Sequence, residues 1–317
     1  MKILITGSCG FIGFHISKFF LEKNNLVIGI DNLNPYYSVK LKKDRLKELK
    51  KYKKFNHFKI DLENKNGINK IFSKYKFDYI FHMAAQAGVR YSINQPRKYI
   101  DSNINGFYNI LEASRDFKIK RLFYASSSSV YGDSKKFPLK EKYSLFPNNT
   151  YSLTKKFNED IANIFNKYYN IKVTGLRFFT IYGEWGRPDM FISKLIFSNL
   201  KKSKFILNNF GNHYRDFTYV GDVVQILYKL IKIKKISNNE VFNVCSNNPI
   251  NLHKVIKNLD KIMGKTKIQK RELQQADVIK THGCNKKINK LVSFKNYTNF
   301  EKGLKKTIEW STRYYQK

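Results

Sequence analysis

The segment Gly7-Ser8-Cys9-Gly10-Phe11-Ile12-Gly13 decides the fold of this chain. It follows an apolar stretch over residues 2–6 and precedes an amphipathic stretch over 12–22, so it connects a strand to a helix. Its glycines have separate uses: one permits the tight turn, one lets the backbone approach a pyrophosphate, and one lets the helix pack on the strand. The free N–H groups at the start of the helix would then meet the phosphates. The pattern predicts a dinucleotide-binding loop formed by Gly7, Gly10 and Gly13.

The residues that end the next two strands identify the dinucleotide. Asp31 lies eighteen residues beyond Gly13, directly after the apolar stretch 26–30. A carboxylate at this place accepts hydrogen bonds from ribose hydroxyls and repels a 2′-phosphate, which favours NAD over NADP. Asp61 and Leu62 follow the third stretch, where the adenine edge would lie, although an aspartate that merely ends a strand explains Asp61 nearly as well.

Strand and helix patterns alternate along the first half of the chain. Short apolar runs rich in β-branched and aromatic residues are separated by longer amphipathic stretches, which is typical of βαβ units. The expected strands are 2–6, 26–30, 55–60, 79–83, 121–125 and 172–178, and the expected helices are 12–22, 38–52, 65–75, 97–117 and 151–168. The fold class is therefore α/β, with a Rossmann doubly wound parallel sheet.

Beyond Phe179 this alternation breaks down. Glycines and prolines divide the chain into shorter elements, as expected for a lobe that covers the carboxyl ends of the strands. We expect residues 1–178 to form the NAD-binding domain, with 215–245 returning to it. Residues 179–214 and 246–317 should form a smaller C-terminal α/β substrate-binding lobe.

The chain is strongly basic, with 60 Lys and Arg residues against 24 Asp and Glu and a formal charge of +36. Such a charge raises nucleic acid or an acidic membrane as a partner. The basic residues are spread along the whole chain, however, and the densest run, Lys40 to Lys54, alternates with Leu41, Leu46 and Leu49 at helical spacing. That run is typical of a solvated helix face over a buried one. We therefore expect neither partner, although the charge would attract anionic substrates.

The three cysteines, Cys9, Cys245 and Cys284, form no C-x-x-C pair and lie far apart in the sequence. They indicate neither a disulfide framework nor a metal site, and they fit a reducing compartment. Glycines interrupt the apolar start of the chain, and no uncharged run approaches the roughly 18 residues that span a bilayer. The expectation is a cytoplasmic protein without a metal.

A Tyr-x-x-x-Lys pair places a phenol and an ammonium on one helix face, where the ammonium can lower the pKa of the phenol. The pattern occurs five times, beginning at Tyr36, Tyr131, Tyr151, Tyr168 and Tyr228. Only the pair of Tyr151 and Lys155 both opens a long helix and follows a hydroxyl cluster, residues 126–129, that ends a strand. This context brings a serine hydroxyl and a phenolate base to the carboxyl edge of the sheet, beside the nicotinamide.

Together these motifs resemble the extended short-chain dehydrogenase/reductases that act on nucleotide sugars. Longer stretches resemble the UDP-glucuronate 4-epimerases of bacteria and plants, almost from end to end, with the match fading after about Asp277. They are DNLNPYY at 31–37, HMAAQAGVRYS at 82–92, LRFFTIYG at 176–183, WGRPDM at 185–190 and RDFTY at 215–219.

By position, the resemblance implies a catalytic group of Ser127, Tyr151 and Lys155. Tyr151 would be the base, Ser127 would share a hydrogen bond with the sugar 4-OH, and Lys155 would bind the nicotinamide ribose. The NAD site would further include Gly7, Gly10, Phe11, Ile12, Gly13, Asp31, Asn32, Asp61, Leu62, Ala84, Ala85, Gln86, Asn103 and Phe179. Thr180 would touch the sugar, Arg215 and Asp277 the UDP, and Arg90 and Arg187 the uronate or diphosphate. Either arginine could instead form a surface salt bridge.

The residues directly after Ser127 indicate which reaction follows once a 4-keto sugar has formed. The dehydratases of this family have an Asp-Glu pair there, and related uronate decarboxylases have a glutamate, whereas this chain has Ser128 and Ser129. Serine does not act as a general acid or base near neutral pH. We expect Ser128, Ser129 and Arg187 to hold the uronate carboxylate so that the β-keto acid intermediate keeps its carbon dioxide.

The sequence thus predicts NAD-dependent 4-epimerisation of UDP-glucuronate to UDP-galacturonate by a homodimer. The dimer is implied by the resemblance, since relatives pair the helices that correspond to 97–117 and 151–168. The apolar residues Phe107, Ile110, Ile161 and Ile164 would suit such an interface, although burial within one subunit explains them almost as well. Alternatives are a 4-epimerase for UDP-glucose or a UDP-N-acetylhexosamine, a UDP-glucuronate decarboxylase, and a non-catalytic NAD-sensing module. The intact pair of Tyr151 and Lys155 argues against the last.

Overall fold

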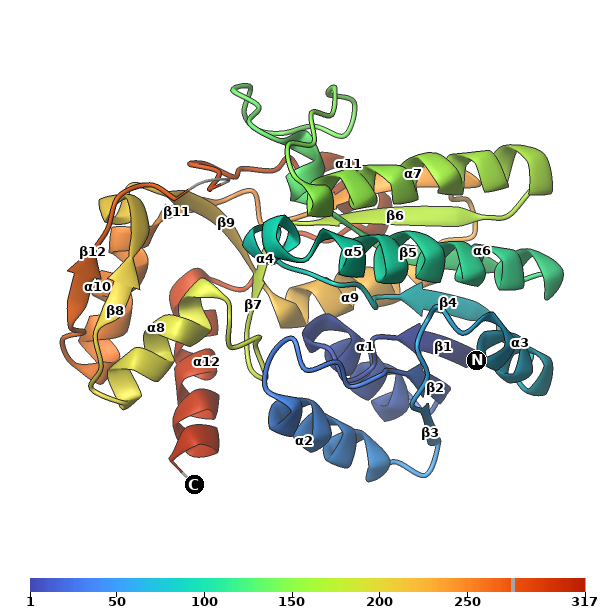
Figure 1. The fold of residues 1–317 in the computed structure, drawn as a ribbon, viewed down its shortest axis with the longest axis horizontal. Coiled ribbons are helices and arrows are strands. Elements are labelled where there is room, and N and C mark those ends of the chain that lie inside the picture. The colour runs from blue at the N-terminus through green and yellow to red at the C-terminus, as the bar shows by residue number, and fades with distance from the viewer. Residues whose placement is uncertain (275–276, 317) are drawn as a thin grey trace. The chain divides into compact units, whose positions relative to one another are not determined.

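A parallel sheet forms the centre of the N-terminal part of the chain. The structure is a computed structural model that describes residues 1–274 and 277–316. Within them, seven strands form one sheet in the order β10-β6-β5-β4-β1-β2-β3 (Figure 1). The strands are β1 (Lys2–Thr6), β2 (Leu26–Ile30), β3 (Phe55–Phe58), β4 (Tyr79–His82), β5 (Arg121–Ser127), β6 (Val173–Phe178) and β10 (Asn239–Val244).

The order of the strands reverses between β1 and β4. The chain passes from β1 to β2 and β3 in one direction and then continues from β4 on the other side of β1, and these strands pair in parallel. A doubly wound sheet binds its ligand outside the carboxyl ends of the strands at this switch point. The expected α/β Rossmann fold is confirmed.

Helices connect these strands and supply the apolar side chains that cover the sheet. They are α1 (Phe11–Glu22), α2 (Val39–Lys50), α3 (Lys65–Lys74), α4 (Val89–Asn94), α5 (Pro96–Tyr99), α6 (Gly106–Asp116) and α7 (Thr150–Tyr169). One core cluster joins Leu4 and Ile80 of the sheet to Phe72, Phe107 and Phe165 of the helices. Fully burying each such side chain contributes about 1.5–3 kcal/mol.

The helix expected over 97–117 runs over residues 96–116 without a break, but its hydrogen-bond geometry changes in the middle. It consists of α5, a π-helix over Ile100–Asn105, and α6, and α4 precedes it. The π-helix accommodates the buried side chain of Asn103, whose amide bonds to the backbone of Gln86, so a polar tertiary contact overrides regular α-helical geometry.

Helix α2 has the solvated basic face over a buried face that its spacing predicts, but two basic residues lie on the buried face. Lys42 and Arg45 are buried in α2 beside Leu41 and Leu49, and Leu46 is only half-buried. The reason is that their charged ends reach polar groups of the neighbouring loops, as described below.

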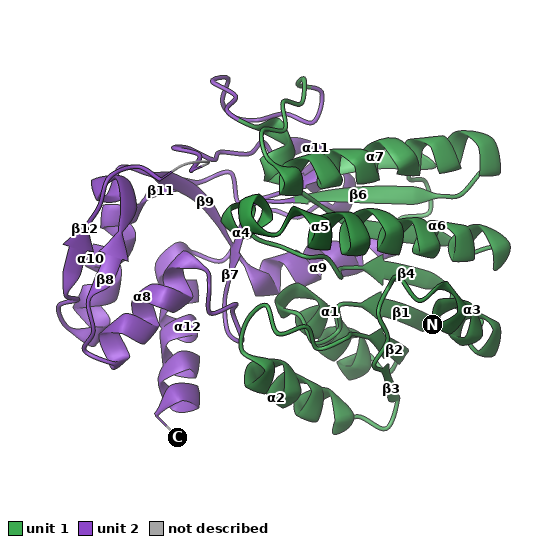
Figure 2. Ribbon diagram, in the orientation of Figure 1, with its two compact units in different colours: residues 1–132, 143–177, 233–242 green, residues 133–142, 178–232, 243–317 purple. Residues whose placement is uncertain are grey.

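The chain divides into two compact units, coloured separately in Figure 2. The first comprises residues 1–132, 143–177 and 233–242, and the second comprises 133–142, 178–232 and 243–317. The expected division, with NAD on 1–178 and 215–245 and the sugar on 179–214 and 246–317, concerns bound ligands and stays a prediction.

The second unit has two small sheets with their own helices. One sheet has the order β11-β9-β7, and the other pairs β12 with β8. Its strands are β7 (Thr180–Tyr182), β8 (Phe205–Leu207), β9 (Tyr214–Tyr219), β11 (Pro249–Asn251) and β12 (Ile268–Lys270), and its helices are α8 (Phe191–Leu200), α9 (Val220–Ile231), α10 (Leu252–Met263), α11 (Lys286–Val292) and α12 (Phe300–Tyr315).

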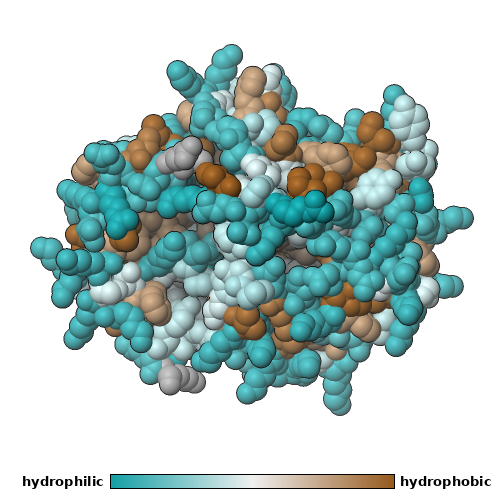
Figure 3. All heavy atoms as spheres, viewed as in Figure 1, coloured by the Kyte–Doolittle hydropathy of each residue, from teal (hydrophilic) through white to brown (hydrophobic). Residues whose placement is uncertain are grey.

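Hydrophilic residues cover most of the face shown in Figure 3, and hydrophobic residues form separate patches on it. Across the described residues, no helix combines the length and apolarity that a bilayer crossing requires.

Candidate functional site

The loop between β1 and α1 admits only glycine at its closest contacts. Gly7 has a φ of +69°, and a Cβ there would lie 2.7 Å from the backbone N of Ala84. A Cβ on Gly13 would lie 2.1 Å from the carbonyl oxygen of Gly7, so α1 packs directly on the loop. Both approaches are closer than real Cβ atoms make, which explains why glycine occupies these positions.

Helix α1 begins without a side-chain cap. Its N-cap residue is Gly10, so the first N–H groups, from Phe11 and Ile12 onward, have no side-chain oxygen of the cap residue to bind. Together with the helix dipole, such N–H groups form a site for a phosphate. The geometry thus supports the predicted use of the loop for a pyrophosphate.

Asp31 lies against this loop. Its two carboxylate oxygens accept hydrogen bonds from the backbone N–H of Cys9, at 3.0 Å, and of Leu33, at 2.8 Å. A carboxylate has about four lone-pair positions, so both oxygens can still accept ribose hydroxyls. Asn32 donates to Asp61, which links the ends of β2 and β3 on the side where adenine is expected.

Arg45 is a residue of this site that the sequence analysis missed. Its guanidinium donates to the carbonyl oxygen of Cys9 at 2.8 Å and to the hydroxyl of Tyr37 at 2.7 Å. Lys42 donates to the carbonyl oxygen of Asn34 at 2.7 Å, in the segment after Asp31. One signal was available, because Arg45 is spaced by four residues from both Leu41 and Leu49 and therefore lies on the apolar face of α2.

The end of β4 is held by amide hydrogen bonds. The side chain of Asn103 accepts from the backbone N–H of Gln86 at 2.7 Å and donates to its carbonyl oxygen at 3.0 Å. It also donates to Thr154 on α7, and Ala84 donates to Thr6 on β1. Buried Leu62 packs against Gly106 at the start of α6, where a Cβ would lie 2.6 Å from the leucine Cβ. The predicted NAD-site residues around Gln86 therefore form one rigid segment, with Ala85 between the fixed residues.

Ser127 ends β5, and a 3-10 helix over Ser128–Tyr131 follows it. The hydroxyl of Ser127 accepts from the backbone N–H of Ser129 and donates to its hydroxyl, both at 3.1 Å. Residues 128 and 129 are half-buried. This turn places three consecutive serine hydroxyls at the carboxyl end of a central strand, the edge where the fold binds ligands.

Tyr151 lies in the first turn of α7, which a capping box of Asn149 and Ser152 begins. One turn later, the ammonium of Lys155 donates to the carbonyl oxygen of Ala125 in β5 at 2.8 Å. Lys155 thereby fixes α7 to the strand that ends in Ser127. Burial lowers the pKa of Lys155 from 10.5 to about 7.

Burial distinguishes this lysine from those of the other four Tyr-x-x-x-Lys pairs. Lys40, Lys135, Lys172 and Lys232 are all exposed. Tyr131, which begins one of those pairs, instead accepts a hydrogen bond from a buried arginine. Lys155 is thus the buried lysine among the five pairs, and the catalytic role of Tyr151 and Lys155 stays a prediction.

A buried ion pair contacts both ends of the serine turn, the segment of Ser127, Ser128 and Ser129. Arg177 on β6 and Glu159 on α7 make two hydrogen bonds, at 2.6 and 2.8 Å. Glu159 also accepts from Ser126, and Arg177 donates to the hydroxyl of Tyr131. Burial lowers the pKa of Arg177, but the hydrogen bonds and charge of Glu159 outweigh it and raise that pKa above its ordinary value. The pair therefore fixes both ends of the segment that carries Ser127, Ser128 and Ser129, a role that no local sequence motif indicates.

The second unit holds the other predicted substrate residues, apart from Arg90. Arg215 on β9 donates to the carbonyl oxygens of Tyr214 and Ile279, so the segment that carries Asp277 runs beside β9. Arg187 forms an ion pair with Asp189 in the loop after β7, and Thr180 begins β7. Phe179 donates its backbone N–H to Val244. Arg90, in the first unit, is exposed on α4.

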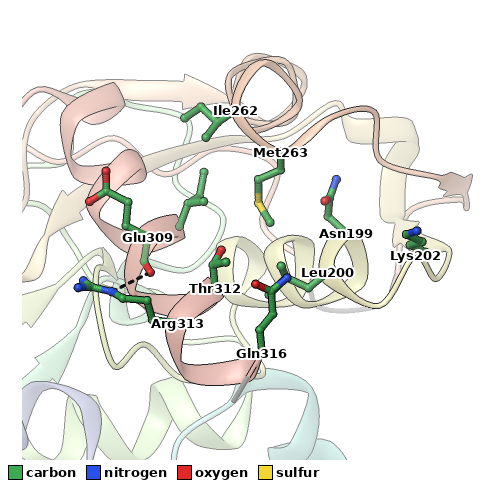
Figure 4. A pocket seen from close by; sticks show the side chains of 10 residues that line it. Asn199, Leu200, Lys202, Ile262, Met263, Glu309, Thr312, Arg313 and Gln316 are labelled. Atoms are coloured by element: carbon green, nitrogen blue, oxygen red, sulfur yellow. Dashed lines mark hydrogen bonds between the residues drawn. The ribbon is translucent and has the colours of Figure 1, made fainter.

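A separate hollow of about 710 Å³ lies between α8, α10 and α12 (Figure 4). Leu200, Ile262, Met263, Thr312 and Arg313 are among the residues that line it. None of the predicted site residues does. Within residues 1–274 and 277–316, no group of three or more His, Cys, Asp or Glu side chains could hold a metal ion.

The chain matches a family model described as GDP-mannose 4,6 dehydratase over residues 4–307. It belongs to the GDP-mannose 4,6-dehydratase family. Protein CapI of Staphylococcus aureus, a similar sequence, is 41% identical over 335 residues that cover 100% of both chains. The UDP-glucuronate 4-epimerase of Thermodesulfobacterium geofontis is 37% identical over 313 residues, 97% of this chain and 95% of that protein.

Among solved structures, the UDP-glucuronic acid 4-epimerase from Bacillus cereus, in complex with UDP-glucuronic acid and NAD, matches with a TM-score of 0.95. It is 28% identical, and the match covers 99% of this chain and 100% of that one. The resemblance to UDP-glucuronate 4-epimerases that the sequence showed is thereby confirmed.

Proposed function

We propose that this protein is an NAD-dependent isomerase that converts UDP-glucuronate to UDP-galacturonate by inverting C4. The observation that carries the proposal is the serine turn beside Tyr151 and Lys155, which has hydroxyls where dehydration or decarboxylation would use carboxyl groups. Relatives of closely similar length that are named UDP-glucuronate 4-epimerases support it. Glu159 accepts a hydrogen bond from Ser126 next to the turn, but Arg177 donates hydrogen bonds to both of its carboxylate oxygens. We therefore do not assign Glu159 as the acid or base of a dehydration or decarboxylation.

The loop around Gly7, Gly10 and Gly13 fits the pyrophosphate of NAD, and Asp31 fits its adenosine ribose. When bound, NAD supplies the acceptor and later the donor of a hydride at C4 of the sugar. Lys155 would hold the nicotinamide ribose, and Phe179 would lie in the same cofactor site. We assign the NAD contacts to the first unit, apart from Phe179, and Thr180, Arg187, Arg215 and Asp277 in the second unit to the nucleotide sugar.

In this mechanism, Tyr151 removes the proton from the 4-OH while Ser127 holds the oxygen by a hydrogen bond. The resulting 4-keto uronate must turn over before the hydride returns to its opposite face. It is a β-keto acid, so it loses carbon dioxide when its carboxylate bond aligns with the carbonyl π-system. Ser128, Ser129 and Arg187 would hold the carboxylate out of that alignment, with Arg90 a further candidate for the uronate or diphosphate.

The test is to incubate the purified protein with UDP-glucuronate and no added NAD. A UDP-galacturonate product without carbon dioxide is expected. A UDP-pentose product would instead indicate a decarboxylase. Turnover of UDP-glucose or a UDP-N-acetylhexosamine, without turnover of UDP-glucuronate, would indicate a neutral-sugar epimerase. No turnover of any UDP-sugar would indicate a non-catalytic NAD-binding module. The Ser128→Ala/Ser129→Ala variant should release pentose, and its failure to do so would contradict the role given to these serines.

We also propose that the protein is a homodimer that pairs α6 and α7 of two subunits. Phe107 and Ile110 face the core of the subunit and are not available. Leu153, Ile164 and Tyr168 instead form an exposed stripe on α7, with Tyr168 66% exposed. With three free, buried cysteines, we infer a reducing, cytoplasmic location.

The interface can be tested by light scattering after gel filtration. Ile164→Glu should convert the dimer to a monomer, because a charge on the stripe would be desolvated on pairing. Ile262→Glu, at a similarly exposed position on α10, is the control and should remain dimeric. A monomeric wild type would contradict the proposal.

A further inference from the structure

The loop that carries Arg187 is fixed to its own unit at its first residues. Gly183 follows β7 with a φ of +148°, and a Cβ there would lie 2.5 Å from a methyl group of Val220. The hydroxyl of Tyr219 donates to both carboxylate oxygens of Glu184, at 2.8 and 2.9 Å. Burial and the charge of Glu184 raise the pKa of Tyr219 above its ordinary value, so it stays a donor. The loop therefore leaves β7 in one defined direction.

The next residue, Trp185, joins an aromatic cluster on α12. Its ring centroid lies 4.8 Å from that of Trp310 and 5.5 Å from that of Tyr314. Trp310 and Tyr314 are one helical turn apart and stack with an interplanar angle of 15° and a centroid distance of 4.9 Å. The three rings thus connect the loop to the last turns of α12.

The backbone of Trp185 has an unfavourable conformation that contacts with the aromatic cluster can stabilise. Its φ of +56° lies in the left-handed region, which costs free energy for a bulky residue. The ring contacts with Trp310 and Tyr314 help to stabilise this conformation. Arg187 follows two residues later, and its Nε donates to Asp189 at 3.0 Å, so its guanidinium is oriented within the same loop.

We propose that Trp310 and Tyr314, acting through Trp185, position Arg187 and thereby set the preference for a sugar carboxylate over a neutral hydroxymethyl group. This rests on the proposed function, in which Arg187 holds the uronate. A guanidinium must match a carboxylate in both distance and plane, so a small displacement of the loop weakens that contact. Contacts to the UDP group would persist, because they are assigned to other residues.

The test compares binding of UDP-glucuronate and UDP-glucose by calorimetry on the NAD-loaded protein. Trp310→Leu should weaken UDP-glucuronate at least tenfold and UDP-glucose less than twofold. Trp310→Phe keeps an aromatic ring and should stay within twofold of the wild type for both ligands. Phe294→Leu is the matched control, since Phe294 belongs to the same unit and packs edge-on against Tyr297, and it should also stay within twofold.

A double variant shows whether the effect passes through Arg187. Adding Trp310→Leu to Arg187→Ala should weaken UDP-glucuronate no further than Arg187→Ala alone. Equal losses for both ligands, or fully additive losses, would overturn the inference. Tyr314→Leu should reproduce the pattern if Trp310→Leu fails to fold, and an unchanged preference in it would overturn the inference too.

The same titrations separate this inference from the proposed reaction. A wild type that prefers UDP-glucuronate but does not epimerise it would remove the proposed function and leave the inference standing. A wild type that epimerises UDP-glucuronate without preferring it in binding would overturn the inference alone.

Discussion

Two properties of Lys155 in the proposed mechanism oppose each other. As a buried amine it is easier to deprotonate than a free lysine, yet its ammonium is what would favour the phenolate of Tyr151. The hydrogen bond to Ala125 offsets only part of the loss of water around the charge. The sequence favours Tyr151 and Lys155 as the catalytic pair, and burial, which the sequence does not state, distinguishes this lysine from those of the other four pairs.

Replacing Tyr151 tests that choice. Tyr151→Phe should lower kcat by about 10²- to 10⁴-fold, because it removes the group that takes the proton, while NAD stays bound. Turnover of UDP-glucuronate and the absorbance of released cofactor measure the two effects. Tyr168→Phe alters the same motif beside the exposed Lys172 and should leave kcat unchanged. An active Tyr151→Phe protein would show that another group is the base.

Lys155 also predicts a dependence of stability on pH. Between pH 7 and 8.5 the unfolded chain keeps this proton and the folded protein loses it, so the free energy of unfolding should rise with pH. The slope is at most about 1.4 kcal/mol per pH unit. Urea unfolding of the ligand-free protein should show the rise in the wild type and in Lys172→Met, but not in Lys155→Met. A Lys155→Met protein with the wild-type slope would refute the low pKa.

At the scale of elements, the buried ion pair of Glu159 and Arg177 joins α7, β6 and the two ends of the serine turn. Arg177→Met would leave Glu159 buried without its partner, which costs about 3–5 kcal/mol of stability. Tyr131→Phe removes one acceptor of Arg177 and should cost about 1–3 kcal/mol. Chemical denaturation measures both. A loss below 1 kcal/mol for Arg177→Met would mean that solvent reaches the pair.

The limits of the first strands follow from the sequence for a physical reason. Parallel strands are buried on both faces, so residues such as 2–6 and 26–30 form continuous apolar runs whose limits match β1 and β2. The π-helical segment within the helix expected over 97–117 could not be predicted, because it accompanies the tertiary hydrogen bonds of Asn103 to the backbone of Gln86. Arg45 is hidden within a basic run, where its spacing of four residues from Leu41 and Leu49 is the one local sign that it lies on the buried face of α2.

At the scale of the whole molecule, the charge of +36 acts on every anionic substrate. Attraction at a distance raises the association rate and is screened by salt over about 10 Å at 0.1 M. The value of kcat/KM for UDP-glucuronate should therefore fall as ionic strength rises from 10 to roughly 300 mM. A matched series with a neutral osmolyte controls for viscosity and water activity. A flat salt profile would show that the basic residues do not steer the substrate.

The two tryptophans of the chain, Trp185 and Trp310, both belong to the second unit. Indole fluorescence therefore reports the unfolding of that unit, whereas far-ultraviolet circular dichroism sums the helices of both. If the units melt separately, the two signals will give different midpoints. Added NAD, proposed to bind mainly the first unit, would then raise the midpoint of the dichroism more than that of the fluorescence. Comparing the two signals thus shows, without an added label, whether the two units unfold together.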